Sequence, residues 1–385
     1  MDDAYQKRTT AFQYRLADAG VDTAVIFDPD NIYYLTAFWG YLGMQFGRPT
    51  LVVIPKAGDC SIITPSLEAE MARKMTWIEN ITEWSDGVDG EWRTCLKNLF
   101  SDKGELKVGI ESHKTHPLIA EYLKKEYFNV EIVDVTDTLS DMRMVKTPEE
   151  IETMRQAGQI SVAMCRGGME TIAEGVPEYE VALAVIASGT RKAAEYLTDV
   201  GSERLFSPMI HNLQVLQSGG RDLSMVHRRP TVRSVQRGES VYMCFCEMNN
   251  FKGIKLGFDR QYWVGEVPEE EARLYEIALK AQAAALDMIR PGVIAEEVHL
   301  AAARIYQKDG FGLCYRTGRS VGFSLIEAPE LKMGDKTPLQ AGMTFAVDGA
   351  VSIPQKAAAR VGDSIVVTEE GFDYLTPFPK ELQVL

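Results

Sequence analysis

The chain has 385 residues, and its 45% hydrophobic and 25% charged content is typical of a soluble globular protein with two domains. Its formal charge of −14 argues against a nucleic-acid partner, because phosphate binding needs a basic surface. The sequence has no apolar run of the roughly 18 to 20 residues that a membrane span needs, and no secretion signal opens it. We therefore expect a cytoplasmic protein with neither a membrane nor a nucleic-acid partner.

The first part of the chain alternates between helix and strand patterns. An amphipathic helix is predicted over 4–20 and a short buried strand over 23–27, which the sequence Asp28-Pro29-Asp30 ends as a turn. Strands 50–54 and 60–63 form a predicted hairpin. A helix over 118–126 and a strand over 129–135 follow. These elements predict an α/β N-terminal domain, residues 1–143, with its own core.

A capping box marks the predicted domain boundary. Thr147 is placed as an N-cap, Pro148 as the first helical residue, and Glu150 three residues after the cap. Helices over 148–173 and from 178 to 197 are expected next. Strands around 205–218, 239–248 and 258–264, helices over 267–290 and 294–309, and a strand-rich end over 320–376 complete the chain. Strands segregated from helices predict an α+β second domain, residues 144–385.

His227 is the foremost candidate for catalysis among the five histidines. It lies in a polar loop before a predicted strand, and an imidazole there exchanges protons near neutral pH. His211 is a weaker candidate, and His299 is expected to be a structural residue that packs with its neighbours on a helix. Cys244 and Cys246 share one face of a strand, but no second cysteine pair completes a zinc site, so reduced thiols are expected.

Several phrases, in order along nearly the whole chain, resemble the creatinase/proline-dipeptidase family. They include His-x-x-Pro-Thr from His227, the junction 145–151, and the closing phrases 341–345 and 368–380. The resemblance implies a small α/β N-terminal domain and a pita-bread (creatinase/aminopeptidase-like) catalytic domain. It also implies that His227 acts as general base and acid.

The resemblance departs from most of the family at the five positions that ligate two metal ions. These positions fall on Cys244 or Cys246, Gly257, Arg319, Asp348 and Gly362. Apart from a possible cysteine thiolate, Asp348 alone among them keeps a side chain that can bind a metal ion. Two hard divalent ions need several oxygen or imidazole donors. We therefore expect no metal and no other cofactor.

The remaining resemblance is to creatinase, which works without metal. Asp259 and Asp348 match two glutamates that contact a guanidinium group, and Phe46-Gly47-Arg48 matches a segment whose arginine reaches a substrate carboxylate from the partner subunit. A carboxylate-binding arginine expected near Leu325 is absent, and Arg319 is a candidate replacement. The prediction is a homodimer with shared active sites.

The predicted function is hydrolysis of a C–N bond in a small zwitterion. Both glutamate positions are shortened to aspartate, so a cyclic amidine such as ectoine suits the site better than creatine. Two alternatives remain open. One is a binding protein that has lost catalysis, and the other is a metal-dependent Xaa-Pro peptidase or lyase with rearranged ligands.

Overall fold

The computed structural model describes residues 2–385 except 89, 101–103, 127–129, 211–214, 226 and 247–249. The chain divides into two compact units, Met1–Met142 and Arg143–Leu385, and each is described by itself. The division falls within helix α6 (Thr136–Met144). No helix among the described residues is both long enough and apolar enough to span a membrane.

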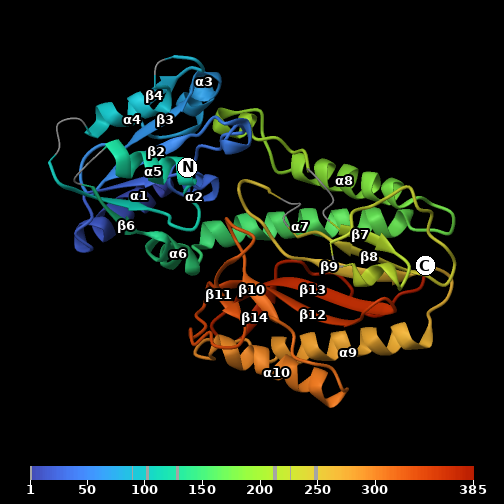
Figure 1. Cartoon of the computed structure of the whole chain (residues 1–385). Coiled ribbons are helices and arrows are strands. Elements are labelled where there is room, and N and C mark those ends of the chain that lie inside the picture. Colours follow the sequence, from blue (N-terminus) through green and yellow to red (C-terminus); the bar gives the residue numbers. More distant parts are fainter. Residues whose placement is uncertain are drawn as a thin grey trace. The chain divides into compact units, whose positions relative to one another are not determined.

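Unit 1 is a mixed sheet with helices (Figure 1). Its strands lie in the order β4-β3-β2-β1-β5-β6, where β1 pairs antiparallel with β2 and parallel with β5. The hairpin predicted around residues 56–59 is present as antiparallel β2 and β3. The strands are β1 (Thr23–Ile26), β2 (Leu51–Pro55), β3 (Ser61–Pro65), β4 (Asn80–Trp84), β5 (Leu106–Ile110) and β6 (Val130–Asp134). The helices before α6 are α1 (Asp2–Asp18), α2 (Pro29–Thr36), η1 (Met44–Phe46), α3 (Ser66–Met75), α4 (Trp92–Phe100) and α5 (Pro117–Glu126).

Helix α2 was not predicted, because Asp28-Pro29 was interpreted as a turn. Proline also suits the first helical position, and here Pro29 begins a helix in which residues 31–36 are all buried. Tyr34 donates from its hydroxyl to the Met142 carbonyl oxygen at 3.0 Å. A contact over that sequence distance is invisible to local pattern analysis.

In unit 2, the described residues contain an eight-stranded antiparallel sheet. Its strand order is β11-β10-β12-β13-β9-β8-β7, with β14 also paired to β13. The strands are β7 (Val215–Ser218), β8 (Ser240–Cys244), β9 (Asp259–Trp263), β10 (Gly318–Ser320), β11 (Glu327–Leu331), β12 (Thr344–Ile353), β13 (Ala357–Val367) and β14 (Phe372–Tyr374). The helices are α7 (Pro148–Thr171), α8 (Glu178–Ala194), η2 (Gly201–Leu205), η3 (Asp222–Ser224), α9 (Glu269–Leu286) and α10 (Ala295–Lys308). Figure 1 shows α7 and α8 along one side of this sheet and α9 and α10 along the other.

The predicted capping box is present at the start of α7. The Thr147 hydroxyl accepts from the Glu150 amide at 3.3 Å, and the Glu150 carboxylate accepts from the Thr147 amide at 2.9 Å. Farther along α7, a Cβ placed on Gly158 would stand 1.8 Å from the Leu375 carbonyl oxygen. Only glycine therefore lets the chain pass so close to this helix. The strand predicted from 205 is wrong over 206–210, which holds no strand and contains Pro208.

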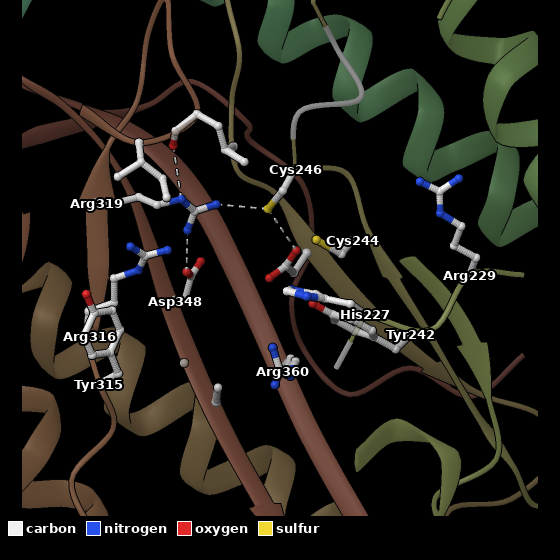
Figure 2. A pocket seen from close by; sticks show the side chains of 15 residues that line it. His227, Arg229, Tyr242, Cys244, Cys246, Tyr315, Arg316, Arg319, Asp348 and Arg360 are labelled. Atoms are coloured by element: carbon white, nitrogen blue, oxygen red, sulfur yellow. Dashed lines mark hydrogen bonds and ion pairs between the residues drawn. The ribbon is translucent and has the colours of Figure 1, made fainter. Parts of the chain in front are cut away.

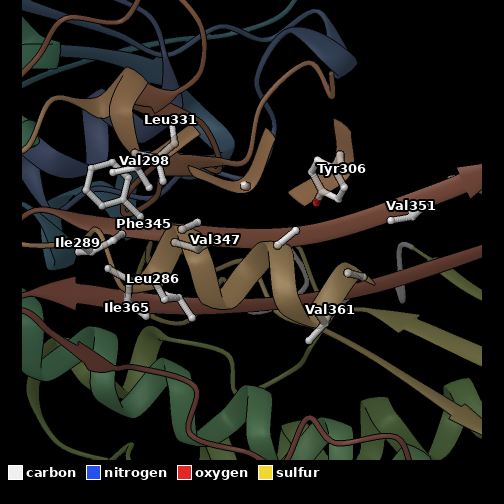
Figure 3. Close-up of a cluster of buried hydrophobic side chains, with 14 of the residues drawn as sticks. Leu286, Ile289, Val298, Tyr306, Leu331, Phe345, Val347, Val351, Val361 and Ile365 are labelled. Carbon is white, nitrogen blue, oxygen red and sulfur yellow. The ribbon is translucent and has the colours of Figure 1, made fainter. Parts of the chain in front are cut away.

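Alternation along β12 and β13 separates a core face from a polar face. Phe345, Val347, Val361 and Ile365 face a buried cluster built with side chains of α9 and α10 (Figure 3). The intervening residues point to the opposite face of the sheet, because successive strand side chains alternate. That opposite face carries Asp348 and Arg360, which stand two residues apart in the β12–β13 register, where Asp348 lies opposite Gly362.

The last residues of the chain are paired with β9. The Trp263 amide donates to the Gln383 carbonyl at 3.1 Å, and the Leu385 amide donates to the Trp263 carbonyl at 2.7 Å. The Gly265 amide donates to the Leu385 carbonyl at 2.9 Å. Residues 383–385 therefore supply backbone partners beside β9.

Candidate active site

A cavity of about 670 Å³ opens on the polar face of the unit 2 sheet (Figure 2). The strand pairing brings its walls together, since β8 and β9 pair with each other and β13 lies between β9 and β12. His227, Asp259, Arg319 and Asp348, all predicted as site residues, line it. Its other polar lining residues are Arg229, Tyr242, Cys244, Cys246, Tyr315, Arg316 and Arg360.

The guanidinium of Arg319 occupies the centre of a polar cluster. Its Nη1 lies 3.0 Å from Asp348 Oδ2, its Nη2 donates to Cys246 Sγ at 3.1 Å, and its Nε donates to the Leu325 carbonyl at 3.2 Å. Burial disfavours the charge on Arg319, but Cys246 and Asp348 raise its pKa above the ordinary value. Arg319 therefore stays cationic and pairs with Asp348, which the sequence analysis had assigned separately to substrate binding.

The two carboxylates of the cavity differ in their environment. Asp259 is 6% exposed and accepts a weak hydrogen bond from the Cys246 thiol at 3.8 Å. Burial, opposed by Arg319 and reinforced by Asp259, raises the pKa of Asp348 to about 6. The Oδ1 atom of Asp348 is buried without a hydrogen-bond partner among the described residues. This oxygen is available to a donor on a bound molecule.

His227 lies in an exposed turn, and the segment that follows it is held by hydrogen bonds. The buried carboxylate of Glu178, the first residue of α8, accepts from Arg228 Nη2 at 2.6 Å and from the Thr231 amide at 2.9 Å. It also accepts from the Ser218 amide at the end of β7 at 2.8 Å. Glu178 thus fixes the segment that follows His227 to the sheet. His211, its rival, lies outside the described residues.

Phe46 and Arg48 belong to unit 1 and are not among the lining residues of this cavity. Arg48 forms an ion pair with Asp86, with Nη2 at 2.5 Å from Oδ2. Phe46 is exposed and packs its ring 5.5 Å from that of Tyr41. Their assignment to a partner subunit's cavity stays a prediction.

Sequence reasoning missed Arg229, Tyr242, Tyr315, Arg316 and Arg360 as lining residues. For Arg360 a signal was present, because it is the one charged residue in the run Ala357–Val361 of a strand that is otherwise small and apolar there. A charge at such a position faces either solvent or a cavity. His299 is buried as predicted, with Nδ1 2.9 Å from Thr317 Oγ1.

Both units match family models. Residues 8–145 match the Creatinase/Prolidase N-terminal domain, and residues 152–369 match metallopeptidase family M24. The chain is 28% identical to an agropine synthesis cyclase of Rhizobium rhizogenes, with 98% of this chain and 96% of that protein covered. It is 26% identical to a Xaa-Pro dipeptidase of Lactobacillus helveticus, with 97% of each covered. The solved prolidase of Thermococcus sibiricus superposes with a TM-score of 0.85 at 24% identity over 100% of both chains.

These matches confirm the predicted family and fold class, an α/β N-terminal domain and a pita-bread C-terminal domain. The name of the family implies a metal site, which needs several oxygen, imidazole or thiolate donors in this cavity. Glycine stands at two of the family's ligand positions, 257 and 362, and a side chain would not fit at either. A Cβ on Gly362 would lie 2.6 Å from Asp348 Oδ1 and 3.1 Å from Asp259 Oδ2, and one on Gly257 would lie 2.5 Å from the Ala346 Cβ. The guanidinium of Arg319 already neutralises Asp348. This donor set does not fit two hard divalent ions.

Proposed function

The chain belongs to metallopeptidase family M24, and we propose that within this family it is a hydrolase that cleaves a C–N bond of a small zwitterion without metal. The observation that carries this proposal is the position of Arg319. Its guanidinium contacts both Asp348 and Cys246, so a cationic side chain of the protein occupies the position between these two donors. Electrostatic stabilisation comes here from a fixed guanidinium.

His227 is proposed as general base and acid. In the first step its imidazole takes a proton from water, and the resulting hydroxide attacks the carbon of the C–N bond. In the second step the imidazolium gives that proton to the leaving nitrogen as the bond breaks, so His227 returns to its starting protonation state. Such a group typically contributes a rate factor of about 10² to 10⁴. The exposure of His227 at the cavity gives it access to water.

Asp259 and Asp348 are proposed to receive the cationic end of the substrate. Asp348 keeps one buried oxygen without a partner among the described residues, and Asp259 is the second carboxylate on the cavity wall. A cationic amidine or guanidino group binds two carboxylates by charge-assisted hydrogen bonds.

A metal-dependent Xaa-Pro peptidase is the second candidate, and the names of most relatives favour it. A specific observation supports it as well. Ligand atoms of Cys244, Cys246 and Asp259 all lie within 4.8 Å of one another, so they could hold one soft ion such as zinc. That ion would have to compete with Arg319 for the Cys246 sulfur.

Elemental analysis of the purified protein separates the two candidates. The first predicts less than about one-tenth of a divalent ion per chain after dialysis, and the second predicts about one ion bound through thiolates. Assays with creatine, ectoine and glycylproline, with and without added zinc or manganese, complete the comparison. Zinc- or manganese-dependent cleavage of glycylproline would refute the first candidate.

Replacement of His227 tests the mechanism once a substrate is found. His227→Ala should lower kcat by about 10² to 10⁴ and leave KM nearly unchanged, because His227 moves a proton only in the transition state. His113→Ala, an exposed histidine of unit 1, is the matched control. Near-normal kcat in the His227 variant would remove it from the mechanism.

A further inference from the structure

The cavity carries more positive than negative charge. Four arginines line it, against the two carboxylates Asp259 and Asp348. Two of the arginines form ion pairs with carboxylates of the protein. Arg316 lies 2.7 Å from Glu330 and Arg319 lies 3.0 Å from Asp348.

Arg360 differs from these two arginines. No carboxylate of the described residues forms an ion pair with its guanidinium, which lies 5.9 Å from the centre of the Tyr242 ring. The side chain comes from β13 and lines the cavity (Figure 2). A carboxylate that binds to a partly buried guanidinium forms stronger hydrogen bonds than it would in water, because both groups are charged and partly shielded from solvent.

Neither of the two carboxylates that line the cavity forms an ion pair with Arg360. Asp348 is occupied by Arg319, and Asp259 acts on Arg360 only beyond ion-pair distance. Burial disfavours the charge on Arg360, while Tyr242 and Asp259 raise its pKa, so the side chain remains cationic. Arg360 is therefore a cation of the cavity wall that forms no ion pair among the described residues and could bind a carboxylate of a ligand.

We propose that Arg360 anchors a carboxylate group of the substrate, an inference that rests on the proposed function and specifies its substrate class. Its planar fork binds a carboxylate through two parallel hydrogen bonds. Asp259 and Asp348 then receive the cationic end of the same molecule. The substrate is a small amino- or amidino-carboxylate, and a cavity of about 670 Å³ is of a size that holds such a compound.

This assignment places the carboxylate anchor within unit 2. Arg48, the anchor suggested by the family resemblance, belongs to unit 1 and pairs with Asp86. Arg229 also lines the cavity but is exposed, so its charge is screened by water. Arg360 is the arginine of the cavity that combines burial with the absence of an ion pair among the described residues.

Binding of two matched probes tests the inference without requiring turnover. Succinate and the neutral succinamide are titrated calorimetrically, at low salt, into the wild-type protein and into four variants that replace a single arginine. Arg360→Ala removes the anchor, Arg360→Lys keeps its charge without the fork, and Arg229→Ala and Arg48→Ala remove the same charge elsewhere. Melting temperatures check that each variant is folded.

We expect the wild type to bind succinate and not succinamide. Arg360→Ala should weaken succinate binding at least tenfold, because the charge-assisted hydrogen bonds of the guanidinium to the carboxylate are lost. Arg360→Lys should weaken it less, and Arg229→Ala and Arg48→Ala by less than about threefold. Unchanged binding in folded Arg360→Ala, an equal loss in Arg229→Ala or Arg48→Ala, or a wild type that does not prefer succinate would overturn the inference.

The test is independent of the proposed hydrolysis. Discovery that His227→Ala keeps full activity would refute the hydrolytic mechanism and leave the succinate result untouched. Normal succinate binding by Arg360→Ala would refute the anchor and leave the role of His227 untouched.

Discussion

Glutamine in place of Glu178 should loosen the segment that carries His227. The Glu178 carboxylate is fully buried and receives hydrogen bonds from Ser218, Arg228 and Thr231. Burial alone would raise its pKa, but the hydrogen bonds from Arg228 and then Ser218 and Thr231 outweigh burial and lower the pKa to about 2. The carboxylate is therefore bound more favourably in the folded than in the unfolded chain.

The magnitude follows from proton linkage. Against an ordinary value of 4.5, a folded pKa of about 2 corresponds to about 3 kcal/mol of stability, which is present above pH 4.5. It is lost as the pH falls through about 2, and at pH 3 about 1.4 kcal/mol remains. Glu178→Gln should thus unfold at lower urea than wild type at pH 7, with a difference that shrinks by more than half at pH 3.

Urea unfolding at both pH values measures this effect, and tryptic cleavage after Arg228 reports the loosened segment. Glu180→Gln is the matched control, because Glu180 lies in the same first helical turn and is exposed. The reasoning fails if Glu178→Gln matches Glu180→Gln at pH 7. It fails equally if the difference does not shrink in acid.

Three further predictions concern the stability of unit 2. Glu327→Gln should cost about 3 to 5 kcal/mol in urea unfolding, because it leaves buried Arg143 and Lys146 without their carboxylate, and a cost below 1 kcal/mol would contradict this. Thr147→Ala should cost about 1 kcal/mol through loss of the capping box, while Thr147→Ser should be nearly neutral. Gly158→Ala should cost at least about 1 to 3 kcal/mol, since its methyl group meets the Leu375 carbonyl, and an unchanged melting temperature would refute the close approach.

Features set by neighbours along the chain were predictable from sequence. The capping box at Thr147 depends on residues within 147–150, and the β2–β3 hairpin depends on a short turn, so both were found. The pairing of Arg319 with Asp348 depends on β10 lying beside β12, which local patterns do not encode. The site residues were named from family resemblance, and the geometry adds which of them neutralise each other.

Arg360 is a cavity residue that local sequence patterns did not single out. A lone arginine in an otherwise small and apolar strand indicates that its side chain faces solvent or a cavity, but not which of the two. Only the register of β13 with β12 shows that it shares a face with Asp348 while the intervening residues enter the core. The Glu178 anchor was missed for the same reason, since 50 residues separate it from Arg228.

The pairing of residues 383–385 with β9 has a practical consequence for protein engineering. An affinity tag joined directly to Leu385 would begin at a residue whose amide and carbonyl both hydrogen-bond to the backbone around Trp263 and Gly265. Trimming these last three residues would leave groups beside β9 unpaired, each at a cost of about 1 to 3 kcal/mol if buried. Trp263 is fully buried, so its indole fluorescence would report such damage directly. Expression vectors for this protein should place the tag at the amino end, or separate it from Leu385 by a flexible glycine–serine spacer.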